Sequence, residues 1–133
     1  MPTENKIKNI KLYEIIATGR RKRATANVKL EKGKGIFAIN GKEITQIPKI
    51  ISDVLKLVAM DGKFDVFARV KGGGKTGQVE AIRLGLARAI IQYDPELKST
   101  LRKNSLVTRD QREKERKKPG LRRARRAPQW AKR

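Results

Sequence analysis

The chain has 133 residues, of which 34 are Lys or Arg and 13 are Asp or Glu, so its formal net charge is +21. It contains no cysteine and no histidine, which excludes disulfides and thiolate metal sites and removes the commonest metal ligand and acid–base catalyst. A fold with so much charge of one sign repels itself unless a polyanion neutralises it, and nucleic acid suits Lys and Arg because each phosphate contact releases counterions.

Membrane association is disfavoured by the sequence. No apolar run approaches the roughly 18 residues that a membrane-spanning helix needs. The first six residues, Met-Pro-Thr-Glu-Asn-Lys, lack the apolar centre of a signal peptide. A basic helix on an anionic membrane needs a large apolar face, which the most basic stretch of this chain does not have. We therefore expect a protein of a reducing compartment.

Alternating apolar and polar residues predict strands near the start of the chain. After a flexible lead-in over residues 1–10, we expect one strand from Tyr13 to Ala17. A second strand is predicted over residues 24–31, where the alternation has a clear period of two. Residues 32–35, Lys-Gly-Lys-Gly, predict a hairpin turn, and residues 36–39 a short third strand.

The middle of the chain predicts a helix, a strand and a second helix. Residues 43–58 are expected to be helical with a break at Pro48, because proline is tolerated in the first turn of a helix but not in its interior. Residues 64–71 alternate again and predict a fourth strand. Glycines end this strand, and we expect Thr76 to cap the next helix, with Glu80 in its first turn.

This second helix carries two apolar stripes, one through Ile82 and one through Leu84, so we predict that it is packed on two sides. Asp94 followed by Pro95 predicts the start of a further short helix. The resulting fold class is α+β, a mostly antiparallel four-stranded sheet with helices packed on it, and the predicted domain covers residues 11–107.

The composition changes near Thr108. Residues 108–133 hold 12 Lys or Arg against 3 Asp or Glu, and the last 18 residues hold nine basic residues and no acid. Such a segment cannot bury enough apolar area to offset the entropy lost on ordering. We predict an extended basic C-terminal tail that is disordered alone and ordered by its partner.

The run Gly72–Gly77 fits the pattern G-x-G-x-x-G between a strand and a helix. No apolar parallel strand follows to close a dinucleotide-binding unit, and the first glycine of a Walker loop would fall at Arg69. Nucleotide binding is therefore disfavoured. Two interpretations stay open: backbone N–H groups beside Lys71 and Lys75 hold an RNA phosphate, or the turn has no ligand.

Two other features point to RNA. Arg20, Arg21, Lys22 and Arg23 are four adjacent like charges, which a phosphate-rich partner explains better than a solvated turn does. Arginines in the tail can bind phosphates bidentately and stack on bases. Trp130 can stack on a base or a sugar or can pack against protein, and both alternatives stay open.

Catalytic constellations are absent from the sequence. The carboxylates are scattered, and no Ser, Thr or Lys has an obvious activating base. We predict no enzymatic activity, no metal and no cofactor. Two rival hypotheses are a general nucleic-acid chaperone or histone-like protein, which would bind any duplex with strong salt dependence, and an enzyme that uses the glycine-rich run on a nucleotide.

From about Tyr13 to the last residue the chain resembles the bacterial-type small-subunit ribosomal protein nine family. The motifs that carry the resemblance occur in order along the chain: Ala17–Arg23, Val70–Gln78, Ala81–Arg83, Gly85–Ala89, Tyr93–Leu97, Thr108–Asp110, Glu115–Arg122, Ala124–Gln129 and the terminal Lys132–Arg133. Many members carry Phe or Tyr in place of Trp130 and Ser in place of Ala131, so an aromatic ring is kept while a hydroxyl is lost.

The resemblance implies a ribosomal α+β fold shared with the second domain of small-subunit ribosomal protein five, with a left-handed βαβ crossover, opposite to the usual hand. It implies a cytoplasmic structural constituent of the small-subunit head that binds ribosomal RNA (rRNA) and touches neighbouring ribosomal proteins. An organellar ribosome is equally compatible. The tail would run through RNA to the anticodon stem-loop of transfer RNA (tRNA) in the peptidyl site.

The candidate site residues fall into two sets. The rRNA-binding set comprises Arg20, Arg21, Lys22, Arg23, Lys71, Gly72, Gly73, Gly74, Lys75, Arg116, Lys117, Lys118, Arg122, Arg123, Arg125, Arg126, Gln129 and Trp130. The tRNA-binding set, implied by the resemblance, is Lys132 and Arg133.

Overall fold

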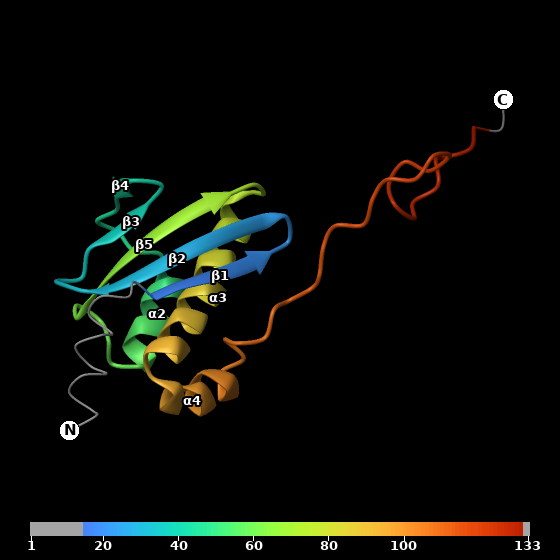
Figure 1. Cartoon of the computed structure of the whole chain (residues 1–133). Helices are drawn as coiled ribbons and strands as arrows, with labels where there is room; N and C mark the ends of the chain where they lie inside the picture. The colour runs from blue at the N-terminus through green and yellow to red at the C-terminus, as the bar shows by residue number, and fades with distance from the viewer. Residues whose placement is uncertain (1–14, 132–133) are drawn as a thin grey trace, which may run out of the picture.

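A computed structural model of the protein describes residues 15–131. The predicted lead-in over residues 1–10, Tyr13 and the terminal pair Lys132 and Arg133 lie outside the described residues. Within them, strands form one sheet, helices cover one of its faces, and a long segment without helix or strand leaves the domain (Figure 1).

The sheet in the described part of the chain has five strands in the order β1-β2-β5-β3-β4. Their bounds are β1 Ile15–Arg21, β2 Ala24–Lys32, β3 Phe37–Ile39, β4 Lys42–Glu43 and β5 Phe64–Lys71. Strand β2 pairs antiparallel with β1 and with β5, and β3 pairs antiparallel with β4, but β3 and β5 run parallel. The four strands that we predicted are therefore too few, and the sheet is mixed.

Strand β4 escaped prediction because it is only two residues long. Asn40 and Gly41 have φ of 52° and 81°, the conformation that a tight hairpin turn needs, and they bring Lys42–Glu43 back alongside β3. The Asn40 side chain accepts a hydrogen bond of 2.8 Å from the backbone N–H of Val70, which ties this hairpin to β5.

The first helix, α2, covers Lys49–Leu57, with Pro48 at its N-cap. The prediction of helix from residue 43 is wrong because Lys42–Glu43 belong to the sheet and the N–H of Ile44 donates to the carbonyl of Phe37 at 2.8 Å. The unit β3-α2-β5 joins neighbouring parallel strands through a helix. Its left-handed crossover stays a prediction from the resemblance.

The long helix α3, Lys75–Tyr93, starts earlier than predicted. Its N-cap is Gly74 rather than Thr76, so Glu80 lies beyond the first turn. Asp94 does cap the following short 3₁₀ helix, Pro95–Leu97, by accepting a bond of 3.1 Å from the N–H of Glu96. A last helix, α4, covers Lys98–Lys103.

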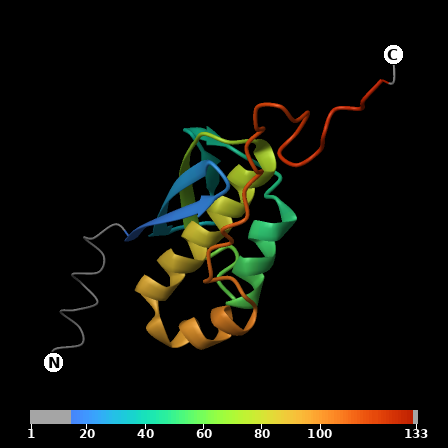
Figure 2. The same ribbon diagram turned by 90° about the vertical axis from the view of Figure 1, so that its right-hand side faces the viewer.

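The core lies between the sheet and the two longer helices. Alternate residues of β2 and β5 are buried, as the period-two pattern predicts, and α3 buries residues all round its circumference. Figure 2 shows α2 and α3 side by side against the same face of the sheet. The opposite face of the sheet carries the polar half of the alternation. The position of α3 fixes both ends of the candidate site, because its first residue follows β5 and its far end leads to the tail.

Candidate nucleic-acid interface

Two basic turns lie side by side at one end of the sheet. Arg21 pairs with Ala24, so Lys22 and Arg23 form a two-residue turn between β1 and β2. The strand register also places Arg20 opposite Thr25, which in turn lies opposite Lys71 at the end of β5. The turn between β1 and β2 and the glycine-rich turn after β5 therefore meet at the same end of the sheet, although about 50 residues of sequence separate them. We refer to this end of the sheet, formed by residues 20–23 and 71–75, as the basic edge.

The glycine-rich turn approaches the backbone of the other turn closely. Gly72 and Gly73 have φ of 76° and 67°, the left-handed region that glycine enters at no steric cost. A Cβ on Gly72 would lie 2.9 Å from the carbonyl oxygen of Arg23, and one on Gly73 would lie 2.9 Å from the N of Ala24. The glycines thus let two cationic turns share one edge.

The N-terminus of α3 opens onto this edge. Among the described residues no side chain caps it, since Gly74 is the N-cap and the Gln78 side chain bonds instead to the carbonyl of Gly72 at 3.1 Å. The first N–H groups of a 19-residue helix attract anions. Lys71 and Lys75 are both exposed beside them.

Lys22 is held in an unusual conformation. Its φ of 51° lies in the left-handed region that non-glycine residues rarely adopt. Arg20, Lys22 and Arg23 are all exposed. An outlier of this kind costs free energy and is tolerated where the surroundings require it. Here it lets the chain reverse within a two-residue turn, beside which all three cations are exposed.

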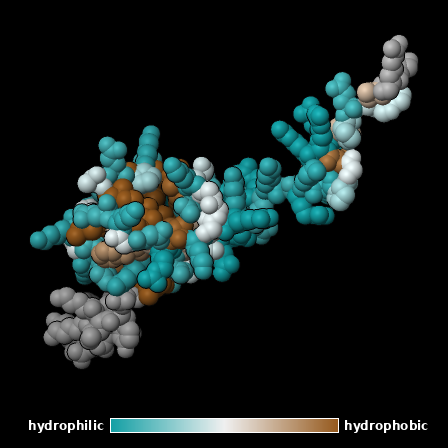
Figure 3. Space-filling view, turned by 90° about the horizontal axis from the view of Figure 1, so that it is seen from above, coloured by the Kyte–Doolittle hydropathy of each residue, from teal (hydrophilic) through white to brown (hydrophobic). Residues whose placement is uncertain are grey.

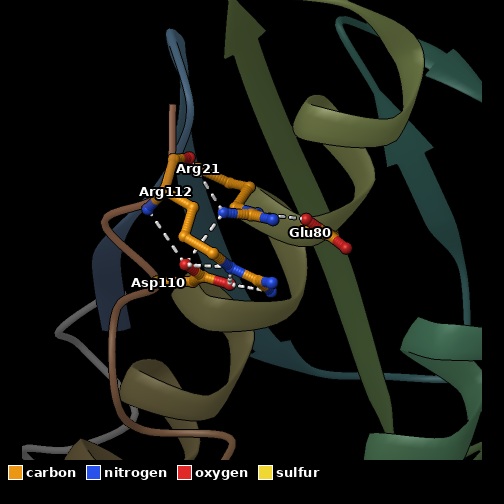
Figure 4. Close-up of polar contacts among 4 residues, drawn as sticks. All are labelled: Arg21, Glu80, Asp110 and Arg112. Atoms are coloured by element: carbon orange, nitrogen blue, oxygen red, sulfur yellow. Dashed lines mark hydrogen bonds and ion pairs between the residues drawn. The ribbon is translucent and has the colours of Figure 1, made fainter. Parts of the chain in front are cut away.

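Arg21 differs from its neighbours because its side chain faces protein. Only 12% of the side chain is exposed, and its Nε contacts the carboxylate of Glu80 on α3 (Figure 4). Its Nη1 lies 3.1 Å from Asp110 Oδ1 and donates to the carbonyl of Arg112 at 3.1 Å. Arg21 thus joins β1, α3 and the first residues of the tail.

Asp110 is held by two cations at once. It accepts hydrogen bonds from the backbone N, Nε and Nη2 of Arg112, the last at 2.6 Å, in addition to its contact with Arg21. These bonds, those of the Arg112 side chain first, hold the pKa of the Asp110 carboxyl well below its usual range. The same pairing raises the pKa of Arg112. We call residues 108–112 the tail root.

Beyond the tail root the chain is exposed and basic. Residues 111–131 contain no helix or strand in the structure, and Figure 3 shows most of this segment as a hydrophilic extension of the domain. It is not extended throughout, because the N–H of Arg122 donates to the carbonyl of Arg126 at 2.8 Å and Gly120 has a φ of 83°. Disorder of the tail in the absence of RNA stays a prediction. The domain boundary at residue 107 also stays a prediction.

Glu115 holds this loop together by pairing with Lys118 at 2.9 Å and with Arg125 at 3.0 Å. Most of the other predicted tail residues point to solvent, and the Trp130 side chain is 82% exposed. The exposed members of the predicted tail set are Arg116, Lys117, Lys118, Arg122, Arg123, Arg125, Arg126, Gln129 and Trp130.

Sequence reasoning missed the residues that attach the tail, Glu80, Asp110 and Arg112. A signal for them existed: Asp110 is one of only three acids in a segment with 12 cations, and a carboxylate between Arg109 and Arg112 is well placed for bidentate pairing. The partner Arg21 lies 89 positions earlier, which no local pattern reveals.

In the described part of the chain, no helix is long and apolar enough to cross a membrane. The same residues contain no group of three or more His, Cys, Asp or Glu side chains that could hold a metal ion.

An α+β domain with cationic turns at one edge and a basic tail attached to that edge defines a nucleic-acid-binding protein of the ribonucleoprotein type. Residues 19–133 match the family model described as ribosomal protein S9/S16. Small ribosomal subunit protein uS9 of Thermotoga neapolitana is 48% identical, over 87% of this chain and 93% of its own length. The protein of the same name from Thermotoga petrophila gives the same values.

The chain therefore belongs to the ribosomal protein S9/S16 family and is a structural constituent of the small ribosomal subunit. Binding of rRNA and a part in translation are properties of this family, whose bacterial-type members work in the cytoplasm, and the family is not known to be enzymatic. The resemblance inferred from the motifs is confirmed.

Proposed function

We propose that the domain docks on small-subunit rRNA in the head of the subunit through the edge where its two basic turns meet. The tail then runs through folded RNA, and Lys132 and Arg133 contact the anticodon stem-loop of tRNA in the peptidyl site. Neighbouring ribosomal proteins of the head are the further partners. The contacts of the last two residues rest on the family resemblance, because these residues lie outside the described part of the chain.

The convergence of three basic segments carries the proposal. Three segments lie together: residues 20–23 at the end of β1, residues 71–75 between β5 and α3, and the tail root. The glycine contacts and Arg21 hold them. Within this group Arg21 pairs with carboxylates, and we assign its main part to holding the tail in place. Arg20, Lys22 and Arg23 are left to face phosphates.

The chemistry of the edge suits a phosphate backbone rather than particular bases. Lys side chains and an uncapped helix N-terminus bind phosphate oxygens without reading sequence, and such contacts position a protein on RNA. A contact of this kind at the end of the tail would serve every tRNA alike. It would help to hold the tRNA and, through it, the reading frame.

Paired substitutions at the two ends of the sheet test the docking edge. Arg20→Gln with Arg23→Gln removes two exposed cations from the proposed edge, and Lys34→Gln with Lys63→Gln removes two exposed cations from the opposite end. We expect the first pair to weaken binding to small-subunit rRNA by at least about tenfold at moderate salt, since each lost phosphate contact forfeits counterion release. Equal losses for both pairs would contradict a defined docking edge.

Replacement of the last two residues tests the tRNA contact. Lys132→Gln with Arg133→Gln should leave assembly of the subunit intact but weaken its affinity for peptidyl-site tRNA and raise the frequency of frameshifts. Arg102→Gln with Lys103→Gln, on exposed positions of α4, is the matched control. Unchanged tRNA affinity and frame maintenance after the first pair would remove the tRNA contact from the proposal while leaving the rRNA contact in place.

A further inference from the structure

We propose that Arg83 and Arg109 form a binding site for one phosphate group of the RNA backbone, in a hollow between α3 and the tail root. The proposal rests on the proposed binding of rRNA. It adds a point of contact that belongs neither to the two basic turns nor to the exposed part of the tail.

The hollow has a volume of about 480 Å³ and opens to solvent. It is lined by Arg83, Asn104, Ser105, Thr108, Arg109 and Asp110. A second hollow of about 330 Å³ shares Arg83 and Asn104 with it and continues toward α2. Arg83 comes from α3 and Arg109 from the tail root, and both line the larger hollow.

Both arginines have an unused hydrogen-bond donor. The Nε atoms of Arg83 and Arg109 are buried and have no hydrogen-bond partner among the described residues. A guanidinium presents its N–H donors in a fixed planar fork, and a buried donor without an acceptor is unfavourable. The two residues that carry these donors line one hollow, so their guanidinium groups offer N–H donors to an oxygen-rich anion in it.

The carboxylate that lines the hollow does not meet this need. Asp110 is already engaged by Arg112, through hydrogen bonds of 2.6 to 3.0 Å, and by Arg21 at 3.1 Å. Two further carboxylates lie nearby, Glu80, which pairs with Arg21, and Asp53, which lines the adjoining hollow with Arg83. Four guanidinium groups thus stand against three carboxylates, so the local charge stays positive and favours a further anion. The hydroxyls of Ser105 and Thr108 are exposed on the same wall and can rotate to donate.

An RNA phosphate fits this site better than a carboxylate from a neighbouring protein. Arg109 is adjacent to Asp110, which the Arg21 contact fixes to the docking edge, so the hollow continues the proposed RNA surface. A phosphodiester can accept from two arginine forks at once through its two free oxygens. RNA held there would also cover the point at which the tail leaves the domain.

The test uses the full chain, small-subunit rRNA and filter binding over a range of salt concentrations. Arg83→Gln with Arg109→Gln should lower the affinity by about tenfold and reduce the slope of log affinity against log salt by about 0.7 to 0.9, the value for one phosphate. Arg102→Gln with Lys103→Gln removes the same charge from α4 and should change affinity less than about threefold. If the glutamine variant does not fold, Arg83→Lys with Arg109→Lys keeps the charge but loses the fork and should still weaken binding.

Ethylation of individual RNA phosphates identifies the ligand. The unchanged chain and the α4 control should share a position at which ethylation blocks binding, and the Arg83/Arg109 variant should no longer respond there. An unchanged interference map together with control-like affinity would overturn the site, while the docking-edge variants would still report on the proposed function separately.

Two further results would also overturn it. One is stabilisation of the unchanged chain, but not of the variant, by inorganic phosphate at matched ionic strength with no change in RNA binding, which would mark a site for the free ion. The other is crosslinking of a photoreactive amino acid at position 105 to protein rather than to RNA in assembled subunits, which would mark a protein contact.

Discussion

Gly19 of β1 and Gly85 of α3 lie backbone to backbone: a Cβ on Gly85 would sit 3.1 Å from the N of Gly19, and a Cβ on Gly19 would sit 1.9 Å from the carbonyl oxygen of Ala81. The strand and the helix approach this closely only because neither position carries a side chain. The contact sets the depth at which α3 lies beneath the sheet.

We predict that Gly19→Ala is strongly destabilising. The new methyl group meets backbone rather than a flexible side chain, so helix and strand must separate, at a cost of about 3 kcal/mol or more in the free energy of unfolding. Gly85→Ala meets mainly the Val28 side chain, at 2.8 Å, and should cost less. Urea unfolding followed by circular dichroism measures both. Gly74→Ala, where a Cβ meets nothing within 4 Å, is the control and should cost no more than about 1 kcal/mol, the loss expected when alanine replaces an N-cap glycine.

Loss of Arg21 should release the tail root. Arg21→Gln removes the contacts with Glu80 and Asp110, and we expect faster amide hydrogen exchange at residues 108–112 with little change in β2 or β5. Arg20→Gln on the same strand loses an exposed cation and should leave exchange in the tail root unchanged. Equal exchange in the two variants would mean that Arg21 does not hold the tail.

Attachment of the tail root should withstand mild acid. Because the pKa of Asp110 is lowered in the folded chain, its pairing is fully present above the pKa of about 3.9 that an unfolded Asp has, and it is lost as pH falls through the lower folded value. We expect the carboxyl carbon of Asp110, followed by nuclear magnetic resonance, to titrate with a midpoint clearly below the pKa of about 3.9 of an unfolded Asp. A midpoint at that value would show that the pairing with Arg112 and Arg21 does not persist in solution.

Asp65 is expected to stabilise the turn at the opposite end of the sheet. Its Oδ1 accepts from the backbone N–H groups of Lys34, Gly35 and Ile36 at 2.9, 3.0 and 2.9 Å. Asp65→Ala leaves these donors without an acceptor and should lower stability by about 2 kcal/mol, whereas Asp65→Asn keeps an oxygen and should cost less. Affinity for rRNA per folded molecule should be unchanged in both. Thermal unfolding measures the change in stability, and a parallel binding assay measures the affinity for rRNA. A loss of RNA affinity would place this turn in the interface.

The sequence predicted elements defined by local pattern and missed those defined by distant partners. The alternation in β2 and β5 and the cap at Asp94 are short-range signals, and the structure confirms them. The parallel pairing of β3 with β5 leaves no trace in either strand, because period two is the same for both directions. The start of α3 was misplaced because Thr76 is the better capping residue, yet the glycines before it turn the chain two residues earlier.

The candidate site was predicted unevenly for the same reason. Runs of cations identify residues 20–23 and the tail, but charge alone does not separate Arg21, whose partners lie on α3 and in the tail root, from the exposed Arg20. Arg83 lies in the motif Ala81–Arg83 but was not predicted to bind RNA, because a single arginine within an apolar helix face forms no cationic run.

The central place of β5 has a consequence for synthesis. In the described sheet β5 lies between β2 and β3, but it is the last of the strands to be translated. The β1–β2 and β3–β4 hairpins therefore cannot join into one sheet until residues 64–71 emerge. That one strand then joins both hairpins, and α3 follows directly to cover the core. Since domains fold as units during synthesis, the core can close before the 12 cations of residues 108–133 leave the ribosome that makes them. The segment most able to capture the wrong RNA is thus exposed only once the domain that directs it can already be in place.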